Sequence, residues 1–193
     1  MKKMTAAIAL MVAALGHAQA QNAPANPLRF VAGMGITAGG DKLVNVSYSN
    51  GESYDLHAGG LIVFDAGVDY RFSPEFSMQS TVSYHVDQAN AKNGNVKFKR
   101  FPIELIGYYH PNTQWRVGGG VRYISSAKLS GSGFGSVAND NFDSTVGALV
   151  EAEYMVSPVL GFKVRLVSEK YKYEHSSTKI NGNHIGFFGN YYF

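Results

Sequence analysis

The sequence predicts an all-β fold: an eight-stranded antiparallel transmembrane β-barrel, built as an up-and-down meander. Three observations support this prediction. Apolar and polar residues alternate along eight segments, the connections alternate between short and long, and the alternation continues to the last residue, Phe193. A period of two is typical of a strand whose two faces meet different surroundings. Because chain ends are usually polar and frayed, a strand that ends on an aromatic residue must be held in a sheet.

The first twenty residues have the layout of a secretory signal peptide. Two lysines precede an apolar run over residues 6–15, and small residues lead to Ala20. A run of this length is about half of the ~20 residues that a membrane-spanning helix needs, which argues against a membrane anchor. We therefore predict a signal peptide over residues 1–20, a short polar leader over 21–27, and the barrel over 28–193.

Composition narrows the class of protein further. Without Lys2 and Lys3, 15 Lys and Arg residues stand against 14 Asp and Glu, so a nucleic-acid partner is not expected. Cysteine is absent, which excludes disulfides and thiolate metal sites. After the signal peptide, no apolar run approaches the length of a spanning helix. An exported chain rich in Gly, Tyr and Phe is then either a soluble all-β protein or a barrel that spans a membrane with strands.

The alternating segments follow one another along the chain in this order: residues 28–40, 57–72, 76–87, 96–110, 115–128, 142–156, 159–173 and 183–193. Three connections are short and contain proline, at residues 73–76, 110–114 and 157–160. Proline fixes φ and stops a strand ladder, so these are tight turns. The other four connections are long and polar, and we expect them to be loops. Short turns at one end and long loops at the other are typical of an outer-membrane barrel with periplasmic turns and exterior loops.

The alternation also assigns the two faces of the wall. One register is apolar, includes Leu105 and Val150, and is predicted to face lipid. The opposite register supplies an interior charge network: Asp65, Asp69, Arg71, Glu104, Arg116, Arg122, Glu151, Glu153, Lys163 and Arg165. Eight strands enclose only enough space for side chains. We therefore expect a closed polar interior of ion pairs and hydrogen bonds, in which a carboxylate pair such as Glu151 and Glu153 is out of reach of a substrate.

A soluble β-sandwich would show the same alternation, so aromatic placement has to separate the two folds. Aromatic residues of the apolar register gather near the tight turns and the C-terminus: Tyr70, Phe72, Tyr109, Trp115, Tyr154, Tyr191 and Phe193. Aromatic residues at one height form the interfacial girdle of a membrane barrel. A sandwich has no reason to collect them at one end, so the barrel is favoured.

The closing alternation, the eight strands and the proline turns resemble the small outer-membrane barrels of the OmpA transmembrane-domain, OmpX and Ail type. The resemblance covers the exported chain and implies a location in the bacterial outer membrane. It also implies insertion by the barrel-assembly machinery, which reads the last strand in that family. Phe193, Tyr191 and Phe187 match that assembly signal, whereas Gly189 replaces one expected apolar residue.

One short motif suggests catalysis. In an extended segment His175 and Ser177 share a face, where a base could activate a hydroxyl. The motif resembles the His-x-Ser of the outer-membrane lipid A deacylases, but Thr178 stands where that family has Asn, and no Asp or Glu follows Glu174. We therefore expect no enzymatic activity, with a lipid A-modifying enzyme that uses His175 and Ser177 as the alternative. The histidines show no metal-site spacing, and neither a metal nor another cofactor is expected.

Basic residues collect toward the long loops: Lys97, Lys99, Arg100, Lys128, Lys170, Lys172 and Lys179. They predict either contacts with lipopolysaccharide phosphates or a merely solvated edge. The sequence as a whole predicts a membrane-structural or surface-interaction role, of an adhesion type, carried by four long exterior loops. The expected partners are outer-membrane lipid and lipopolysaccharide, the assembly machinery, and a surface ligand of the loops. A carrier of a small hydrophobic ligand through a gap in the wall is a further alternative.

Overall fold

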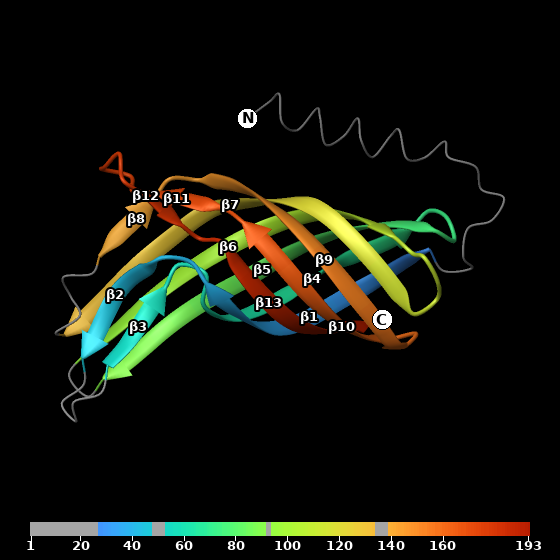
Figure 1. Cartoon of the computed structure of the whole chain (residues 1–193), viewed down its shortest axis with the longest axis horizontal. Helices are drawn as coiled ribbons and strands as arrows, with labels where there is room; N and C mark the ends of the chain where they lie inside the picture. Colours follow the sequence, from blue (N-terminus) through green and yellow to red (C-terminus); the bar gives the residue numbers. More distant parts are fainter. Residues whose placement is uncertain (1–26, 48–52, 92–93, 134–138) are drawn as a thin grey trace.

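The computed structural model describes residues 27–47, 53–91, 94–133 and 139–193, and every regular element in these ranges is a strand (Figure 1). No helix within them is long and apolar enough to cross a membrane. The signal peptide predicted over residues 1–20, and the leader as far as residue 26, lie outside the described residues.

Eight strands form the wall of the barrel: β1 (Leu28–Gly39), β4 (Leu61–Arg71), β5 (Phe76–Ala91), β6 (Gly94–Tyr109), β7 (Trp115–Gly133), β9 (Thr145–Ser157), β10 (Leu160–Ser168) and β13 (His184–Tyr192). They are hydrogen-bonded in the order β6-β5-β4-β1-β13-β10-β9-β7, and a further pairing between β6 and β7 closes the ring. All of these pairings are antiparallel. The predicted eight-stranded meander is confirmed.

The first and last strands of the wall, β1 and β13, are paired with each other. β1 and β13 are paired from Val31–Tyr192 to Gly39–His184. Beyond this ladder, the N–H of Phe193 donates to the carbonyl oxygen of Phe30 at 2.9 Å. The backbone of the last residue is therefore fixed in the sheet, as the terminal alternation predicts.

The three proline turns are closed by side-chain oxygens that accept backbone N–H groups. The acceptors are Ser73 Oγ for Phe76 (3.0 Å), Asn112 Oδ1 for Trp115 (2.8 Å) and Ser157 Oγ for Leu160 (3.1 Å). Ser and Asn are favoured in turns because their side chains bond to nearby backbone in this way. We call this end of the barrel the turn end and the opposite end the loop end.

The four long connections are not plain loops, which corrects the prediction. The first contains a hairpin of β2 (Lys42–Ser47) and β3 (Ser53–His57), and the last contains one of β11 (Lys170–Lys172) and β12 (Lys179–Asn181). In the second, β5 and β6 stay paired as far as Ala91 and Gly94. In the third, β7 runs on to Gly133 and pairs with β8 (Asp140–Phe142). The cause is a second alternation, of apolar with polar residues, which was hidden by the polar composition of these segments.

Along β6, the apolar and the polar side chains exchange faces. Its outward side chains change from lysine to apolar between Lys99 and Phe101. Its inward side chains change in the opposite sense, from apolar to charged, between Phe98 and Arg100. Toward the turn end, β6 is therefore apolar outside and carries buried charge inside, and toward the loop end it is lysine-rich outside and apolar inside.

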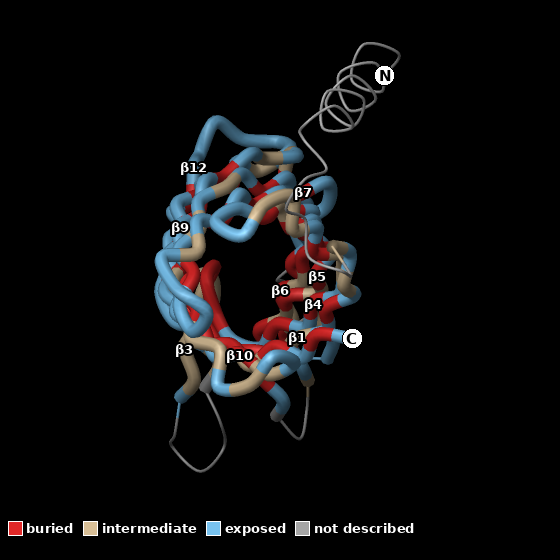
Figure 2. The backbone as a smooth tube through the Cα atoms, turned by 90° about the vertical axis from the view of Figure 1, so that its right-hand side faces the viewer, coloured by how far each residue is buried: buried red, intermediate tan, exposed pale blue. Residues whose placement is uncertain are grey.

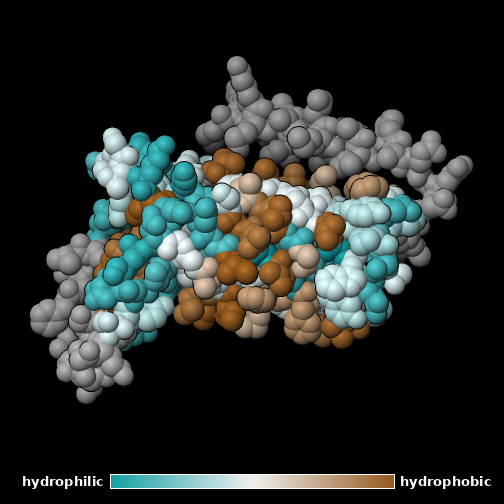
Figure 3. Space-filling model, viewed as in Figure 1, coloured by the Kyte–Doolittle hydropathy of each residue, from teal (hydrophilic) through white to brown (hydrophobic). Residues whose placement is uncertain are grey.

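In the neighbouring strands β5 and β7, the outward side chains change from apolar to polar at the same level. Val86 of β5, Lys99 of β6 and Lys128 of β7 are register partners, and polar residues continue from there toward the loop end. On the face that Figure 3 shows, apolar residues lie in a band across the middle of the barrel and a hydrophilic surface covers the end that carries β2 and β3. An apolar outer face fits lipid hydrocarbon, whereas a lysine-bearing face needs water. The reversal marks where the wall leaves the membrane.

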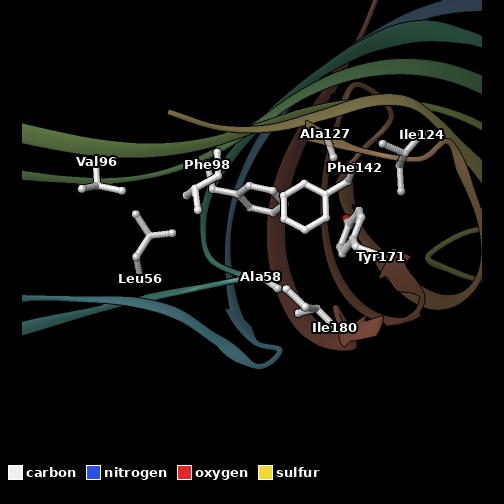
Figure 4. Packing of buried hydrophobic residues seen from close by; sticks show 10 residues of the cluster. Leu56, Ala58, Val96, Phe98, Ile124, Ala127, Phe142, Tyr171 and Ile180 are labelled. Atoms are coloured by element: carbon white, nitrogen blue, oxygen red, sulfur yellow. The ribbon is translucent and has the colours of Figure 1, made fainter. Parts of the chain in front are cut away.

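The inward apolar residues at the loop end form a core of their own (Figure 4). Its buried members are Leu56, Ala58, Val96, Phe98, Ile124, Ala127, Leu129, Phe142, Tyr171 and Ile180. They come from the extended wall strands, from β8 and from both hairpins, so the connections are packed together across this end. We call this assembly the cap. In Figure 2, seen along the barrel, buried and exposed residues alternate along the strands of the wall.

Candidate functional site

An ion-pair cluster fills the lumen near the turn end, centred on Arg116 of β7. Its guanidinium contacts Asp69 Oδ1 at 2.8 Å and Glu153 Oε2 at 2.6 Å, and it donates to Gln79 Oε1 at 2.9 Å. Tyr192 donates to Glu153 Oε1 at 2.8 Å. These side chains are buried, and together they join strands β4, β5, β7, β9 and β13 across the lumen.

A second cluster fills the middle of the lumen around Arg165 of β10. Arg165 contacts Glu104 at 2.9 Å and Glu151 at 2.5 Å, and Lys163 contacts Glu151 at 3.3 Å. Arg122 extends the cluster toward the loop end, at 3.6 Å from Glu104. Each cation touches a carboxylate, so the desolvation of these charges is offset by pairing.

Eight of the ten residues predicted for the interior network take part in these two clusters, and two do not. Arg71 is half-buried at the turn end, where it donates to the carbonyl oxygens of Ser73 and Pro74. Asp65 is buried inside, but it makes no ion pair and no hydrogen bond among the described residues. Arg71 therefore holds a turn, and Asp65 stands alone.

Sequence reasoning missed what connects the lumen to the cap. Arg100 is fully buried, donates to the carbonyl oxygens of Ala58 and Gly60, and lies 4.7 Å from the ring centroid of Phe98. Tyr171 of the cap donates to Glu169 at 2.5 Å, and burial raises the pKa of its phenol. Arg100 shares the inward face of β6 with Phe98, so it does not belong with the basic residues that were expected at the outer edge.

Aromatic side chains line the outer wall at the turn end, as predicted. The pairs Phe76–Tyr109, Trp115–Tyr154 and Tyr191–Phe193 have ring centroids 5.4, 5.0 and 4.9 Å apart. The residues proposed as the assembly signal, Phe187, Tyr191 and Phe193, all point outward and are 53%, 47% and 69% exposed. Tyr191 and Phe193 lie at the turn end, where an outward aromatic ring is suited to a membrane interface, whereas Phe187 lies further along β13.

The wall is hollowed at Gly189 of β13. A groove of about 470 Å³ is lined there by Trp115, Ala152, Tyr154, Phe162, Lys163, Val164, Phe187, Phe188 and Gly189. The ring of Phe162 leans over Gly189, 3.4 Å from where a Cβ would stand. The glycine that interrupts the terminal apolar pattern thus gives the wall an apolar groove.

A family model described as an outer membrane protein beta-barrel domain matches residues 5–193. The chain belongs to this family. Neisserial surface protein A is similar in structure, with a TM-score of 0.52 and 12% identity over 87% of this chain and 98% of that chain. Ail, the attachment invasion locus protein of Yersinia pestis, also has a TM-score of 0.52 and 12% identity, over 86% and 96%. No curated protein matches. The predicted membership among the small outer-membrane barrels is confirmed, and the similarity to these structures concerns the fold.

Four lysines at the loop end of this outer-membrane barrel lie on one connected surface. Lys99 of β6 faces Lys128 of β7, and Lys172 of β11 faces Lys179 of β12. The two pairs are connected through β8, which pairs with β7 and bridges to Tyr173. Lys172 has a partner in Asp143 at 3.2 Å. We call Lys99, Lys128, Lys172 and Lys179 the lysine face.

The catalytic alternative lies in the turn between β11 and β12. His175 and Ser177 are both exposed there, and no hydrogen bond joins them in the part of the chain that the structure describes. In that part, too, no group of three or more His, Cys, Asp or Glu side chains is placed to hold a metal ion.

Proposed function

We propose that this outer-membrane barrel is not an enzyme and serves a membrane-structural or surface-interaction role of an adhesion type. The observation that carries the proposal is the reversal of polarity along the wall. The membrane-spanning part is filled by ion pairs, and the loop end is folded around its own apolar core. A cap with a core is a fixed surface, suited to binding without ordering a loop at each encounter. The names of the two similar proteins, a surface protein and an attachment protein, agree with this role.

The filled lumen predicts that the protein conducts poorly. In a planar bilayer the wild-type barrel should show no large, steady pore, because the buried Arg, Lys, Asp and Glu side chains occupy the lumen. Heat-modifiable migration in gel electrophoresis would confirm that the sample is folded. A stable conductance of porin size from the folded protein would overturn the closed interior.

The lysine face supports lipopolysaccharide as a partner. Like charges directly opposite one another on neighbouring strands are destabilising, and a phosphate between them removes the repulsion. The pair Lys99–Lys128 also lies where the apolar band ends, the height at which lipid phosphates begin. We therefore expect the lysine face to bind the phosphates of the surrounding lipopolysaccharide.

The unfolding temperature tests this partner. Lipopolysaccharide should raise it above its value in uncharged detergent, and Lys99→Gln with Lys128→Gln should remove much of the increase. Lys42→Gln is the matched control, because Lys42 is exposed at the loop end but already lies 3.5 Å from Asp55. An increase that the double variant leaves unchanged would exclude the lysine face.

The outward aromatic residues of β13 support the assembly machinery as a second partner. Phe193→Ser should lower the amount of folded protein in the outer membrane, because the family resemblance assigns recognition to the last strand. Phe30→Ser, which changes an equally outward aromatic residue on β1, is the control. Equal loss in both variants would point to lipid contact in place of recognition.

Two alternatives have direct tests. If His175 and Ser177 hydrolyse lipid A, then His175→Ala or Ser177→Ala should change the acylation of lipid A as read by mass spectrometry; we expect no change. The apolar groove at Gly189 is the observation that favours a carrier of small hydrophobic ligands. In that case Gly189→Leu should slow the uptake of a fluorescent apolar probe by cells, whereas we expect uptake to be independent of this protein.

A further inference from the structure

The apolar groove at Gly189 crosses the neighbouring strands β13, β10, β9 and β7. Toward the turn end it is bounded by three aromatic residues that are successive register partners, Trp115, Tyr154 and Phe162. The register partner of Phe162 on β13 is Gly189, so this aromatic row ends at a position without a side chain. The groove has a volume of about 470 Å³, many times the ~30 Å³ that a water molecule occupies in the liquid. It therefore has room for a long segment of a ligand.

The floor of the groove is apolar. Ala152, two residues from Tyr154 on β9, contributes only a methyl group. Lys163 and Phe188 also line the groove, although their side chains are buried on the lumen side of the wall. They therefore present backbone to the outside, and this backbone is paired because β10 and β13 each have a partner strand on both sides. A surface whose backbone groups are already paired suits a hydrocarbon ligand.

The surroundings of the groove follow from the family. The outward apolar face of an outer-membrane barrel meets lipid hydrocarbon. Val150 and Leu166, register partners beyond the groove toward the loop end, are 56% and 53% exposed on that face. The groove is therefore continuous with the lipid-facing surface, and its occupant comes from the membrane. Short turns of such barrels lie on the periplasmic side, so the nearest lipids are the phospholipids of the periplasmic leaflet.

The turn-end rim of the groove lies at the height of the membrane interface. The ring of Tyr154 lines the groove, while its hydroxyl accepts a hydrogen bond from Nε2 of Gln114 at 3.3 Å. Gln114 is exposed in the turn before β7. Tyrosine and tryptophan are suited to this height because one end of the side chain is apolar and the other is polar. A lipid that enters beside Tyr154 can keep its headgroup at the turn and lay its chain along the floor.

We propose that this groove holds one acyl chain of a periplasmic-leaflet phospholipid as a fixed lipid. The chain lies against the aromatic row and covers the floor at Ala152 and Gly189. A concave seat gives a chain more close contacts than a convex part of the wall, so this chain exchanges more slowly than its neighbours. Phospholipid is the occupant because it is the most abundant source of acyl chains in that leaflet, and mass action favours it. This site is independent of the proposed surface role.

The fluorescence of Trp115 tests the site, because Trp115 lines the groove and is the only tryptophan in the sequence. A phosphatidylethanolamine brominated near the middle of one chain is titrated into the folded protein in uncharged detergent, since bromine quenches tryptophan on contact. Quenching should saturate at one lipid per protein, above the linear part that random collisions in the micelle give. Gly189→Leu places a side chain in the groove and should raise the half-saturating lipid concentration by about tenfold.

Two further variants complete this experiment. Gly119→Leu is the matched control, because Gly119 is an outward glycine of β7 outside the groove, and a Cβ there would meet no atom closer than 3.8 Å. It should leave the quenching unchanged. Ala152→Leu fills the floor from β9 and leaves the last strand intact, so it decides the result if Gly189→Leu does not fold. It should raise the half-saturating concentration as Gly189→Leu does.

Quenching of the wild-type protein that rises linearly without saturation would overturn the proposal, and so would saturation that neither filled variant changes. A brominated free fatty acid that saturates at a lower concentration than the phospholipid would assign the groove to a mobile ligand and exclude phospholipid as its occupant. A second copy of the chain seated on the groove would shield Trp115, so quenching that appears only when the protein is diluted would also overturn the proposal.

Discussion

The membrane-spanning lumen and the cap share strands β6 and β7, yet their chemistry is opposite. In the lumen, inward residues such as Arg116 and Arg165 are charged and paired. In the cap, inward residues such as Phe98 and Leu129 are apolar and pack together. The outward residues change in the opposite sense, from apolar side chains to lysines. The surroundings of the wall therefore decide which side chains point inward. Where hydrocarbon lies outside, the polar side chains point into the lumen, and where water lies outside, the apolar side chains point into the core.

The two regions also differ in how they respond to the loss of a side chain. A charge in the lumen is balanced by specific partners, so its removal leaves carboxylates buried and unpaired. An apolar residue in the cap has no such partner, and its removal leaves a cavity that neighbours fill in part. Substitution in the lumen should destabilise the whole barrel, whereas substitution in the cap should loosen the loop end alone.

The largest effect should come from Arg116. Arg116→Met keeps much of the volume but leaves Glu153 without its cation and Asp69 with Arg29 alone. Breaking a buried pair from one side costs 3–5 kcal/mol, and because Gln79 and Tyr192 also lose this partner we expect about 5 kcal/mol. Denaturant titration of the folded barrel in detergent micelles measures this loss.

Arg29→Gln is the control for Arg116. Arg29 also contacts Asp69, but its side chain is 25% exposed, and Asp69 retains Arg116. Its removal should therefore cost less than about 1 kcal/mol. Equal losses for the two arginines would show that the lumen is wet and its charges are screened.

The next largest effect should be confined to the cap. Phe98 packs edge-on against Phe142 and Tyr171, with centroids 5.4 and 5.6 Å away. Phe98→Ala should weaken this packing by about 4 kcal/mol. Amide hydrogen exchange should then become up to a thousandfold faster in β3 and β11, while β10 keeps its protection. Phe101→Ala, on the outward face of the same strand, should leave exchange in the cap unchanged, and uniform acceleration along the chain would contradict an independent cap.

A charge placed on the wall locates the boundary between the regions. Leu105→Arg or Val150→Arg puts a cation on the apolar band and should cost roughly 3 kcal/mol in a refolding titration in lipid vesicles. Ser132→Arg, also exposed but on the loop-end side of Lys128 in β7, should cost almost nothing because it meets water. If all three variants are tolerated equally, the apolar band does not face hydrocarbon.

The sequence was sufficient for the wall because each wall strand repeats one simple pattern. The alternation from Phe187 to Phe193 and the proline turns locate the strands, the outward face and the pairing of the last strand with the first. The cap was missed because its segments are rich in Gly, Ser and Asn, although "VKFKRF" at 96–101 carries the reversal in six letters. The isolation of Asp65 could not be read from the sequence at all, since it depends on which side chains reach across the lumen.

His110, in the turn after β6, allows a comparison by pH at the turn end. It is half-buried, with Nε2 at 2.9 Å from Ser77 Oγ. Burial, with the positive charges of Arg71 and Arg116, lowers the pKa of His110 from 6.5 to about 4. The unfolded chain therefore takes up this proton near pH 6.5 and the folded protein only near pH 4, so stability is complete above pH 6.5 and is lost as the pH falls toward 4.

The smallest predicted effect follows from this histidine. Between pH 6.5 and 4 the free energy of unfolding should fall, and His110→Asn should make that fall smaller by about 1 kcal/mol or less, because solvent screens a half-exposed group. His175→Asn, which changes an exposed histidine on the loop-end hairpin, should leave the pH dependence as it is. Urea titrations at the two pH values separate the variants. If the free energy of unfolding of His110→Asn falls with pH as steeply as that of the wild type, water reaches the turn end. The ion-paired lumen would then begin only above this turn, at Arg116.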